Sequence, residues 1–157
     1  MPIDPNLVGQ DLPPLEYEYT TKDVILYALG IGAGAEEEEL KFVYENELEA
    51  IPTFGVIPPF GALMSIVGME GMDFNLAMLL HGEQYLELYK NIPVEGKVIS
   101  YPKIAAIYDK VKGALVEIDV VTKDTKDEAL FMNRFSTFIR GEGGITPKVG
   151  IASSSFS

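Results

Sequence analysis

The sequence predicts an α+β fold in which a long antiparallel β-sheet wraps round one apolar α-helix. Two observations lead to this expectation. The stretch 51–67 is almost wholly apolar and carries no charge from Gly55 onward. Four strand-like runs joined by short turns then follow it, and strands joined by sequential hairpins favour an antiparallel sheet over βαβ units. A single apolar helix enclosed by such a sheet is the hot-dog architecture.

The apolar stretch is the expected centre of the fold. Its seventeen residues are few for a membrane-spanning helix, and three prolines and two glycines interrupt them. We therefore expect a buried helix that the chain enters through a Pro-rich turn and that is apolar on most of its circumference.

The N-terminal half predicts one strand and one helix before this centre. Residues 1–14 are Pro-rich and are expected to form an extended arm, ordered only where it packs. Residues 15–20 alternate apolar and polar as a strand does, and Thr20 or Thr21 can cap the helix that follows. Glycines at 30, 32 and 34 end that helix; their spacing loosely resembles a phosphate loop, but a helix stop is favoured.

Two further segments lead from this helix to the central stretch. The acidic run 36–39 is typical of a solvated face. Residues 40–45 are expected to form a short strand or extended segment.

The C-terminal half predicts the meander of about four strands, over 81–89, 97–108, 114–122 and 128–140. In the first of these, Gln84, Leu86 and Leu88 fall on one side. Pro102 indicates a sheet edge or a bulge. We expect one domain over 15–144 and a loose Gly/Ser-rich tail over 145–157.

Composition excludes several classes of function. The chain has 157 residues, a net charge of −12, no Cys and one His. Without Cys there are no disulfides, thiolate metal sites or Cys nucleophiles, and one His excludes a multi-His metal centre; we expect no metal and no other cofactor. The negative charge argues against nucleic acid or an anionic membrane as partner. The first ten residues lack the features of a secretory signal peptide.

Six stretches of the sequence, taken together and in order, carry a resemblance to a known family. They are Tyr27-Ala-Leu-Gly-Ile-Gly-Ala33, Leu40-Lys-Phe-Val-Tyr-Glu45, Pro52-Thr-Phe-Gly-Val-Ile57, Leu80-His-Gly-Glu-Gln-Tyr-Leu-Glu-Leu-Tyr89, Asp109-Lys-Val-Lys-Gly113 and Arg140-Gly-Glu-Gly-Gly144. They resemble the MaoC-like dehydratases, and in particular the N-terminal hot-dog half of 2-enoyl-CoA hydratase 2, as in peroxisomal multifunctional enzyme type 2. The likeness covers roughly Pro13 to Gly144.

The resemblance implies an enzyme family that adds water to a trans-2-enoyl-CoA to form a (3R)-hydroxyacyl-CoA. In this family two hot-dog halves lie side by side, and the C-terminal half carries a Gly-Asp-x-Asn-Pro-x-His element whose Asp and His act as general acid and base through a water. No such element occurs in this sequence. The resemblance therefore implies the half that shapes the acyl tunnel, without the catalytic pair.

Candidate catalytic residues follow from the same motifs, and each has a structural alternative. Glu45 ends the Tyr-Glu element; a carboxylate beside an apolar helix can act on a water, or it can be a structural hydrogen-bond acceptor. His81 is the single imidazole and, with Glu83, can form a base and its orienting group. A lone His is also commonly a satisfied structural residue.

Candidate substrate-binding residues lie on both sides of the central stretch. Tyr27, Phe54, Phe60 and Met64 are candidates for lining the acyl tunnel, where flexible Met side chains suit adaptable apolar sites, although ordinary core packing explains the same pattern. Lys110 and Lys112 in a tight turn can meet a CoA phosphate, or they can simply solvate a hairpin. Two other basic residues, Arg134 and Arg140, are weaker candidates.

Three functions remain open at this stage. The chain is the inactive substrate-shaping half of a hydratase, or a self-sufficient homodimeric hot-dog enzyme acting as hydratase or thioesterase, or a non-catalytic acyl-CoA-binding module. In each case we expect an acyl-CoA ligand and either a homodimer or pairing with a second hot-dog domain, because a lone half exposes a sheet edge. The resemblance implies the peroxisome, although Ser155-Phe-Ser157 is not a Ser-Lys-Leu signal; otherwise we expect the cytoplasm.

Overall fold

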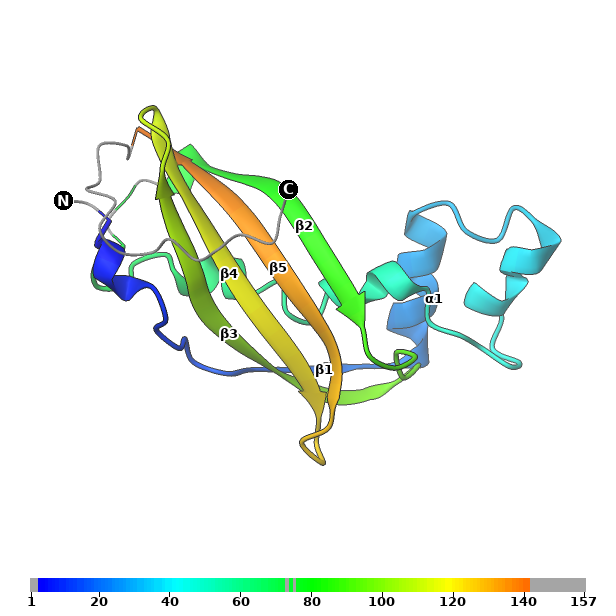
Figure 1. Cartoon of the computed structure of the whole chain (residues 1–157). Helices are drawn as coiled ribbons and strands as arrows, with labels where there is room; N and C mark the ends of the chain where they lie inside the picture. Colours follow the sequence, from blue (N-terminus) through cyan, green and yellow to red (C-terminus); the bar gives the residue numbers. More distant parts are fainter. Residues whose placement is uncertain (1–2, 73, 75, 142–157) are drawn as a thin grey trace.

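The computed structural model describes residues 3–72, 74 and 76–141, and the predicted tail 145–157 lies outside this part of the chain. Its centre is a five-stranded antiparallel sheet in the order β1-β3-β4-β5-β2 (Figure 1). The strands are β1 (Leu15–Tyr19), β2 (Leu79–Leu88), β3 (Gly96–Asp109), β4 (Gly113–Asp124) and β5 (Ala129–Arg140). With few helices on one face of this sheet, the predicted α+β hot-dog fold is confirmed.

The strand order corrects one detail of the expected meander. Strands β3, β4 and β5 are joined by hairpins and pair in sequence, but β2 pairs with β5 and not with β3, which follows it in the chain. The short β1 pairs with the first residues of β3. The expectation that consecutive strands pair through hairpins fails here, because the β2–β3 connection runs from β2 at one edge of the sheet to β3, next to the edge strand β1 on the opposite side.

The helical segments are shorter than the sequence indicated. They are α1 (Thr21–Gly30), α2 (Ala62–Ser65) and the 3-10 helices η1 (Pro5–Leu7), η2 (Glu37–Phe42), η3 (Pro52–Val56) and η4 (Leu76–Met78). The continuous buried helix expected within 51–67 is wrong in extent. The Pro-rich entry takes up η3 and the turn after it, because a proline cannot donate the helical hydrogen bond, and leaves α2 only one turn of α-helix.

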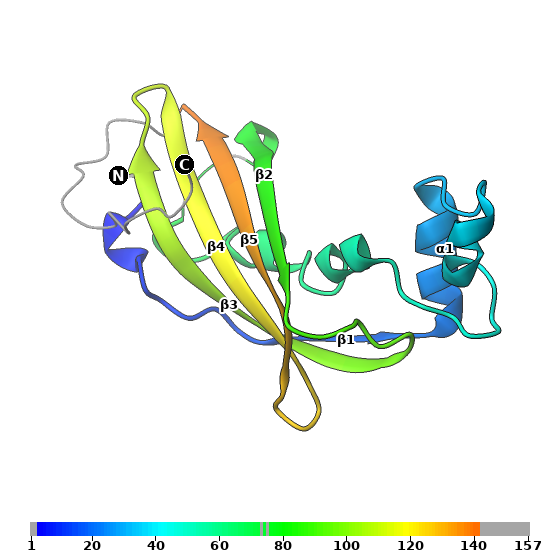
Figure 2. The ribbon, with the colours of Figure 1, turned by 45° about the vertical axis from the view of Figure 1, so that its right-hand side comes forward.

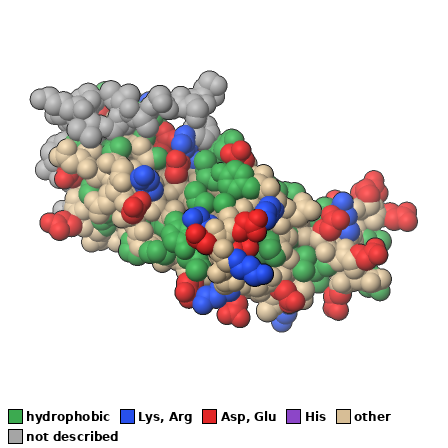
Figure 3. Space-filling model, turned by 60° about the horizontal axis from the view of Figure 1, so that its bottom comes forward, with side chains coloured by type: hydrophobic (Ala, Val, Ile, Leu, Met, Phe, Trp, Pro, Cys, Tyr) green, Lys and Arg blue, Asp and Glu red, His purple; other side chains and the backbone are tan. Residues whose placement is uncertain are grey.

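The projecting part of the molecule is formed by α1 and η2, which lie beyond the sheet at the right of Figures 1 and 2. As predicted, α1 begins after Thr20, whose backbone N–H donates to the Asp23 carboxylate at 2.8 Å. The short strand or extended segment expected over 40–45 is wrong: its first residues complete η2, and Glu45 follows in a bend. The acidic run starts that 3-10 helix, and Figure 3 shows acidic side chains gathered over this part.

The concave face of the sheet holds the core. On β5 this face carries Phe131, Asn133, Phe135, Thr137 and Ile139, all fully buried. The segments η3 and α2 pack into the concavity on the same side in Figures 1 and 2. The N-terminal arm also contributes to the core, since Ile3, Leu7 and Leu12 are buried. They belong to the same apolar cluster as residues 62, 63 and 66 of the α2 segment and as buried residues of β3, β4 and β5.

A buried polar contact fixes the central segment to the sheet. The Asn133 side chain donates to the backbone carbonyl of Gly55 at 3.0 Å and accepts from Gln84 Nε2 at 2.8 Å. One side-chain amide therefore joins η3, β5 and β2, and it replaces a backbone partner that the broken helix does not supply. Within the described residues no helix is long and apolar enough to cross a membrane.

Candidate functional site

An aromatic cluster lies where the central segment meets the start of β2. The ring centroids of Phe60 and His81 are 6.3 Å apart, and those of His81 and Phe135 are 5.8 Å apart. Phe135 is fully buried, whereas Phe60 is 47% exposed and His81 is also exposed. The structure thus brings two predicted site residues, Phe60 and His81, together at the edge of the concave face.

Apolar side chains continue this exposed surface. Met64 of α2 is 52% exposed and Met78 of η4 is 42% exposed, although neighbouring residues of α2 are buried. We call Phe60, Met64 and His81 the mouth of the concave face. An apolar surface beside the open end of a core is the expected place for an acyl chain or for a second domain.

The predicted pair of His81 and Glu83 is wrong. A β-bulge at Gly82 shifts the register, so that His81 lies opposite Thr137 and Glu83 lies opposite Ser136. Residues that face each other across a sheet point to the same side. His81 therefore shares the concave face with Thr137, while Glu83 shares the opposite, convex face with Ser136, and the carboxylate cannot orient the imidazole.

Tyr27 and Phe54 belong to a second aromatic cluster at the other end of the core. The Tyr27 hydroxyl lies 3.0 Å from Thr53 Oγ1, and its ring meets that of Phe54 edge-on at 5.5 Å. Phe54 is 1% exposed and also packs against Tyr19, at 5.1 Å. These residues join α1, η3 and β1, and a ligand would reach Phe54 only if the rings moved apart.

Glu45 follows η2 in the chain, and the segment after η2 belongs to the projecting part, away from the start of β2 (Figures 1 and 2). The Glu45 side chain is exposed in the bend after η2. The structure does not bring Glu45 next to His81, so the two predicted catalytic residues do not form one site within this chain. No group of three or more His, Cys, Asp and Glu residues in the described ranges is placed to hold a metal ion.

The two predicted CoA-binding lysines lie in the β3–β4 hairpin. Lys110 stands over the Tyr108 ring, with 5.6 Å from Nζ to the ring centroid. Lys112 lines a cavity of about 470 Å³ together with Met78, Phe138, Arg140 and Gly141. Sequence reasoning gave no reason to join Arg140 to Lys112, because only the pairing of β4 with β5 places the end of β5 beside this hairpin.

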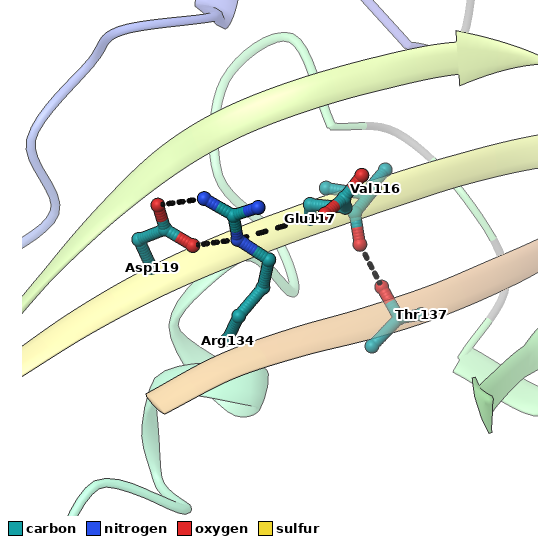
Figure 4. A network of polar contacts seen from close by, with 5 residues as sticks. All are labelled: Val116, Glu117, Asp119, Arg134 and Thr137. Atoms are coloured by element: carbon teal, nitrogen blue, oxygen red, sulfur yellow. Dashed lines mark hydrogen bonds and ion pairs between the residues drawn. The ribbon is translucent and has the colours of Figure 1, made fainter. Parts of the chain in front are cut away.

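The convex face carries a different polar group, which is structural (Figure 4). Arg134 donates to both carboxylate oxygens of Asp119, at 2.5 and 2.7 Å, and its Nε lies 3.6 Å from Glu117 Oε2. The hydrogen bond to Asp119 raises the pKa of Arg134, with burial acting in the opposite direction. The arginine is committed to these two carboxylates, so an anionic ligand would have to compete with them.

The comparison with protein families identifies this arrangement. The model of the MFE-2 hydratase 2 N-terminal domain matches residues 17–141. The chain belongs to this family. Its predicted resemblance to the N-terminal hot-dog half of hydratase 2 is thereby confirmed.

Relatives agree with this assignment. The chain is 43% identical to a probable enoyl-CoA hydratase 2 of Dictyostelium discoideum over 88% of the chain and 48% of that protein. It is 42% identical to peroxisomal multifunctional enzyme type 2 of Mus musculus, over 90% of the chain and 20% of that protein. A MaoC-like dehydratase from Phytophthora capsici superposes with a TM-score of 0.79 at 28% identity, over 97% of the chain and 54% of that structure. The chain thus spans about half or less of the length of the curated relatives that it matches.

Proposed function

We propose that this chain is the substrate-shaping N-terminal hot-dog half of an (R)-specific 2-enoyl-CoA hydratase, and that a second hot-dog domain supplies the catalytic Asp and His. The observation that carries the proposal is the match of the hydratase 2 N-terminal domain to residues 17–141, in a sequence without the Gly-Asp-x-Asn-Pro-x-His element. The substrate would be a trans-2-enoyl-CoA, as the names of the enoyl-CoA hydratase relatives indicate.

The mouth supports a role in acyl binding. Phe60 and Met64 present exposed apolar side chains beside the buried core, and Phe135 beneath them makes the floor apolar. An acyl chain that lies against these side chains is removed from water, and each buried methylene contributes about 0.8 kcal/mol. Tyr27 and Phe54 lie at the other end of the core, where their ring contact joins α1 to η3. Their role would be to hold the central segment in place and not to contact the acyl chain at the mouth.

The free edge of β2 supports pairing with a second hot-dog domain. In the described sheet β2 pairs with β5 alone, so one side of a ten-residue strand has no strand partner. Exposed strand edges of this length are commonly covered by another chain or domain. The mouth lies at the start of this strand, so a domain that pairs there would also close the acyl site.

A self-sufficient homodimer is the second candidate, and the exposure of His81 beside Phe60 favours it. The partner copy would then place its own surface over the mouth, and His81 would act as the base of a hydratase or thioesterase. Glu45 would take part only through the partner copy, since its segment, after η2, lies in the projecting part and away from the start of β2, where His81 lies.

The decisive assay is hydration of a medium-chain trans-2-enoyl-CoA, followed as loss of the conjugated thioester absorbance. We expect acyl-CoA binding but no turnover by the chain alone, and turnover after addition of a hot-dog half that carries the Asp/His element. A Phe60→Ser variant should bind the acyl-CoA more weakly, with Val111→Ser at the exposed hairpin tip as control. Turnover by the chain alone that disappears in His81→Ala would establish the homodimer instead.

Several relatives carry peroxisomal names, among them the enzyme of Arabidopsis thaliana. We propose that this chain also works in the peroxisome. Co-sedimentation of the protein with a peroxisomal marker from the cells that produce it would support this placement, and recovery with cytosolic markers alone would contradict it.

A further inference from the structure

The tip of the β3–β4 hairpin exposes an apolar side chain between two cations. Val111 is 84% exposed, and the exposed Lys110 and Lys112 flank it; we call these three residues the hairpin tip. Val111 has a φ of 67°, in the left-handed region where a β-branched residue is rare. Its backbone N–H donates to the Asp109 carboxylate at 2.8 Å, which holds the turn in this form. A strained apolar residue that is held in solvent indicates a contact with another molecule.

A cavity with complementary properties lies beside η2. Its volume is about 440 Å³, within the range of small-molecule sites, so it has room for a side chain. The ion pair of Lys41 with Glu49, at 3.4 Å, also lines it, and both side chains are exposed. The apolar part of its lining, which comes from η2, the segment before η3, the end of β2 and the β2–β3 connection, includes Phe42, Leu48, Leu88 and Ile92. We call this space the η2 cavity.

The surroundings of the η2 cavity favour a cationic occupant. Residues 36–49 carry seven acidic side chains and one basic side chain, and so half of the net charge of −12. The Lys41–Glu49 pair joins side chains that are 50% and 62% exposed, and pairs of this kind contribute little to stability. A second cation can therefore approach Glu49 at low cost. An apolar cavity in such an acidic segment fits an apolar side chain that is flanked by basic residues.

The hairpin tip and the η2 cavity cannot meet within one molecule. The cavity lining includes residues 91–94, just before β3 begins, and the tip directly follows the last residue of β3. The 14 residues of this strand separate the two features by about 40 Å, since a strand rises about 3.3 Å per residue. Figures 1 and 2 likewise show the β3–β4 hairpin at the end of the sheet opposite to the projecting part. A contact between tip and cavity therefore joins two copies of the chain.

We propose that the hairpin tip of one copy docks into the η2 cavity of a second copy. Val111 enters the cavity, and Lys110 and Lys112 lie against the acidic side chains of residues 36–49. Each copy offers one tip and one cavity, so this heterologous contact continues from head to tail and does not stop at a pair. A hairpin tip buries little surface, and the affinity is accordingly weak, micromolar to millimolar. The residues of the mouth take no part, so the contact is separate from the acyl site and goes beyond the proposed function.

Sedimentation velocity of the full chain over a concentration series tests this contact. We expect the mean mass of the wild type to rise past that of a dimer, and added salt to reduce it. Lys112→Glu and Glu49→Lys should each weaken association at least about tenfold. Lys126→Glu, the same charge change at the exposed tip of the β4–β5 hairpin, should behave as wild type. A wild type that stops at a monomer or dimer, or either variant associating as wild type does, would overturn the proposal.

Mixing the two variants identifies the geometry of the contact. The Glu49→Lys protein keeps an intact tip and the Lys112→Glu protein keeps an intact cavity, so an equal mixture should form a one-to-one heterodimer and nothing larger. A mixture that associates no more than its separate components would contradict head-to-tail docking.

A further variant, Val111→Asn, separates docking from folding. Asparagine accepts the left-handed conformation, so the melting temperature should not fall, whereas self-association should be lost with the apolar side chain. Wild-type association of Val111→Asn would mean that Val111 does not enter the cavity.

Discussion

Replacing Arg134 by Met should destabilise the protein more than the loss of any surface ion pair. Arg134 makes a bidentate contact with Asp119, at 2.5 and 2.7 Å, and lies 3.6 Å from a Glu117 side chain that is only 5% exposed (Figure 4). Without the arginine, two carboxylates remain close together and one of them has almost no access to water. Removal of one partner of a buried pair is costly for this reason.

The magnitude follows from these contacts. Two charge-assisted hydrogen bonds at about 1.5 kcal/mol each would amount to roughly 3 kcal/mol. Without the arginine, the Asp119 side chain, which is 26% exposed, regains part of its hydration, whereas the Glu117 side chain, which is 5% exposed, does not. The free energy regained by hydrating Asp119 is offset by the repulsion between the two carboxylates. We expect a loss of about 3 kcal/mol for Arg134→Met, of which Glu117→Gln in the same chain should restore at least about 1 kcal/mol.

Urea unfolding at neutral pH measures these differences, provided that fluorescence and circular dichroism give coincident transitions. Lys97→Met is the matched control, because its ion pair with Glu16 at 3.1 Å joins two exposed side chains and should contribute less than about 0.5 kcal/mol. A change below about 0.5 kcal/mol for Arg134→Met, or a double variant less stable than the single one, would refute the reasoning.

Three further predictions concern titration and packing. Burial is the main cause that raises the pKa of Tyr19 from an ordinary value of 10.0 to about 12. The stability that the neutral Tyr19 contributes is therefore complete below pH 10 and is lost as the pH rises toward 12, and melting curves of Tyr19→Phe should lack this loss. The backbone N–H of Glu128 is the main cause that lowers the pKa of Asp124 from 3.8, so the stability difference between wild type and Asp124→Ala should be constant above that pH and shrink below it. Gly113→Ala should lower stability by about 2 kcal/mol in urea unfolding, because the new Cβ would lie 2.5 Å from the Ile139 carbonyl oxygen; unchanged stability would mean that the strands can separate there.

Local sequence patterns predicted the features that depend on neighbouring residues, such as a helix cap or the alternation of side chains along a strand. The alternation of Gln84, Leu86 and Leu88 gave the half-buried side of β2, and the glycines after Ala28 marked the end of α1. The capping residue of α1 was also predictable, because a cap acts on the backbone within three residues. The resemblance of ordered motifs added the family and the fold, which composition alone does not distinguish.

Two segments differ from the structure that their local pattern predicts. The segment 40–45 looks extended, but its first residues close η2 and Glu45 lies in a bend after it. The apolar stretch 51–67 looks like one helix, yet its prolines break it, and Asn133, distant in sequence, provides a polar contact for Gly55 in η3. A contact of this kind has no signature in the segment that it stabilises.

The sequence by itself determined the class of fold and the family, since these depend on residue types and on order along the chain. The tertiary structure alone decided which residues meet. One inserted residue at Gly82 moves Glu83 to the convex face and separates it from His81, because side-chain direction in a strand reverses at every residue. Likewise, pairing of β4 with β5 brings Arg140 to Lys112 across 28 positions of sequence, and no local pattern carries information about a contact made by a ladder between strands.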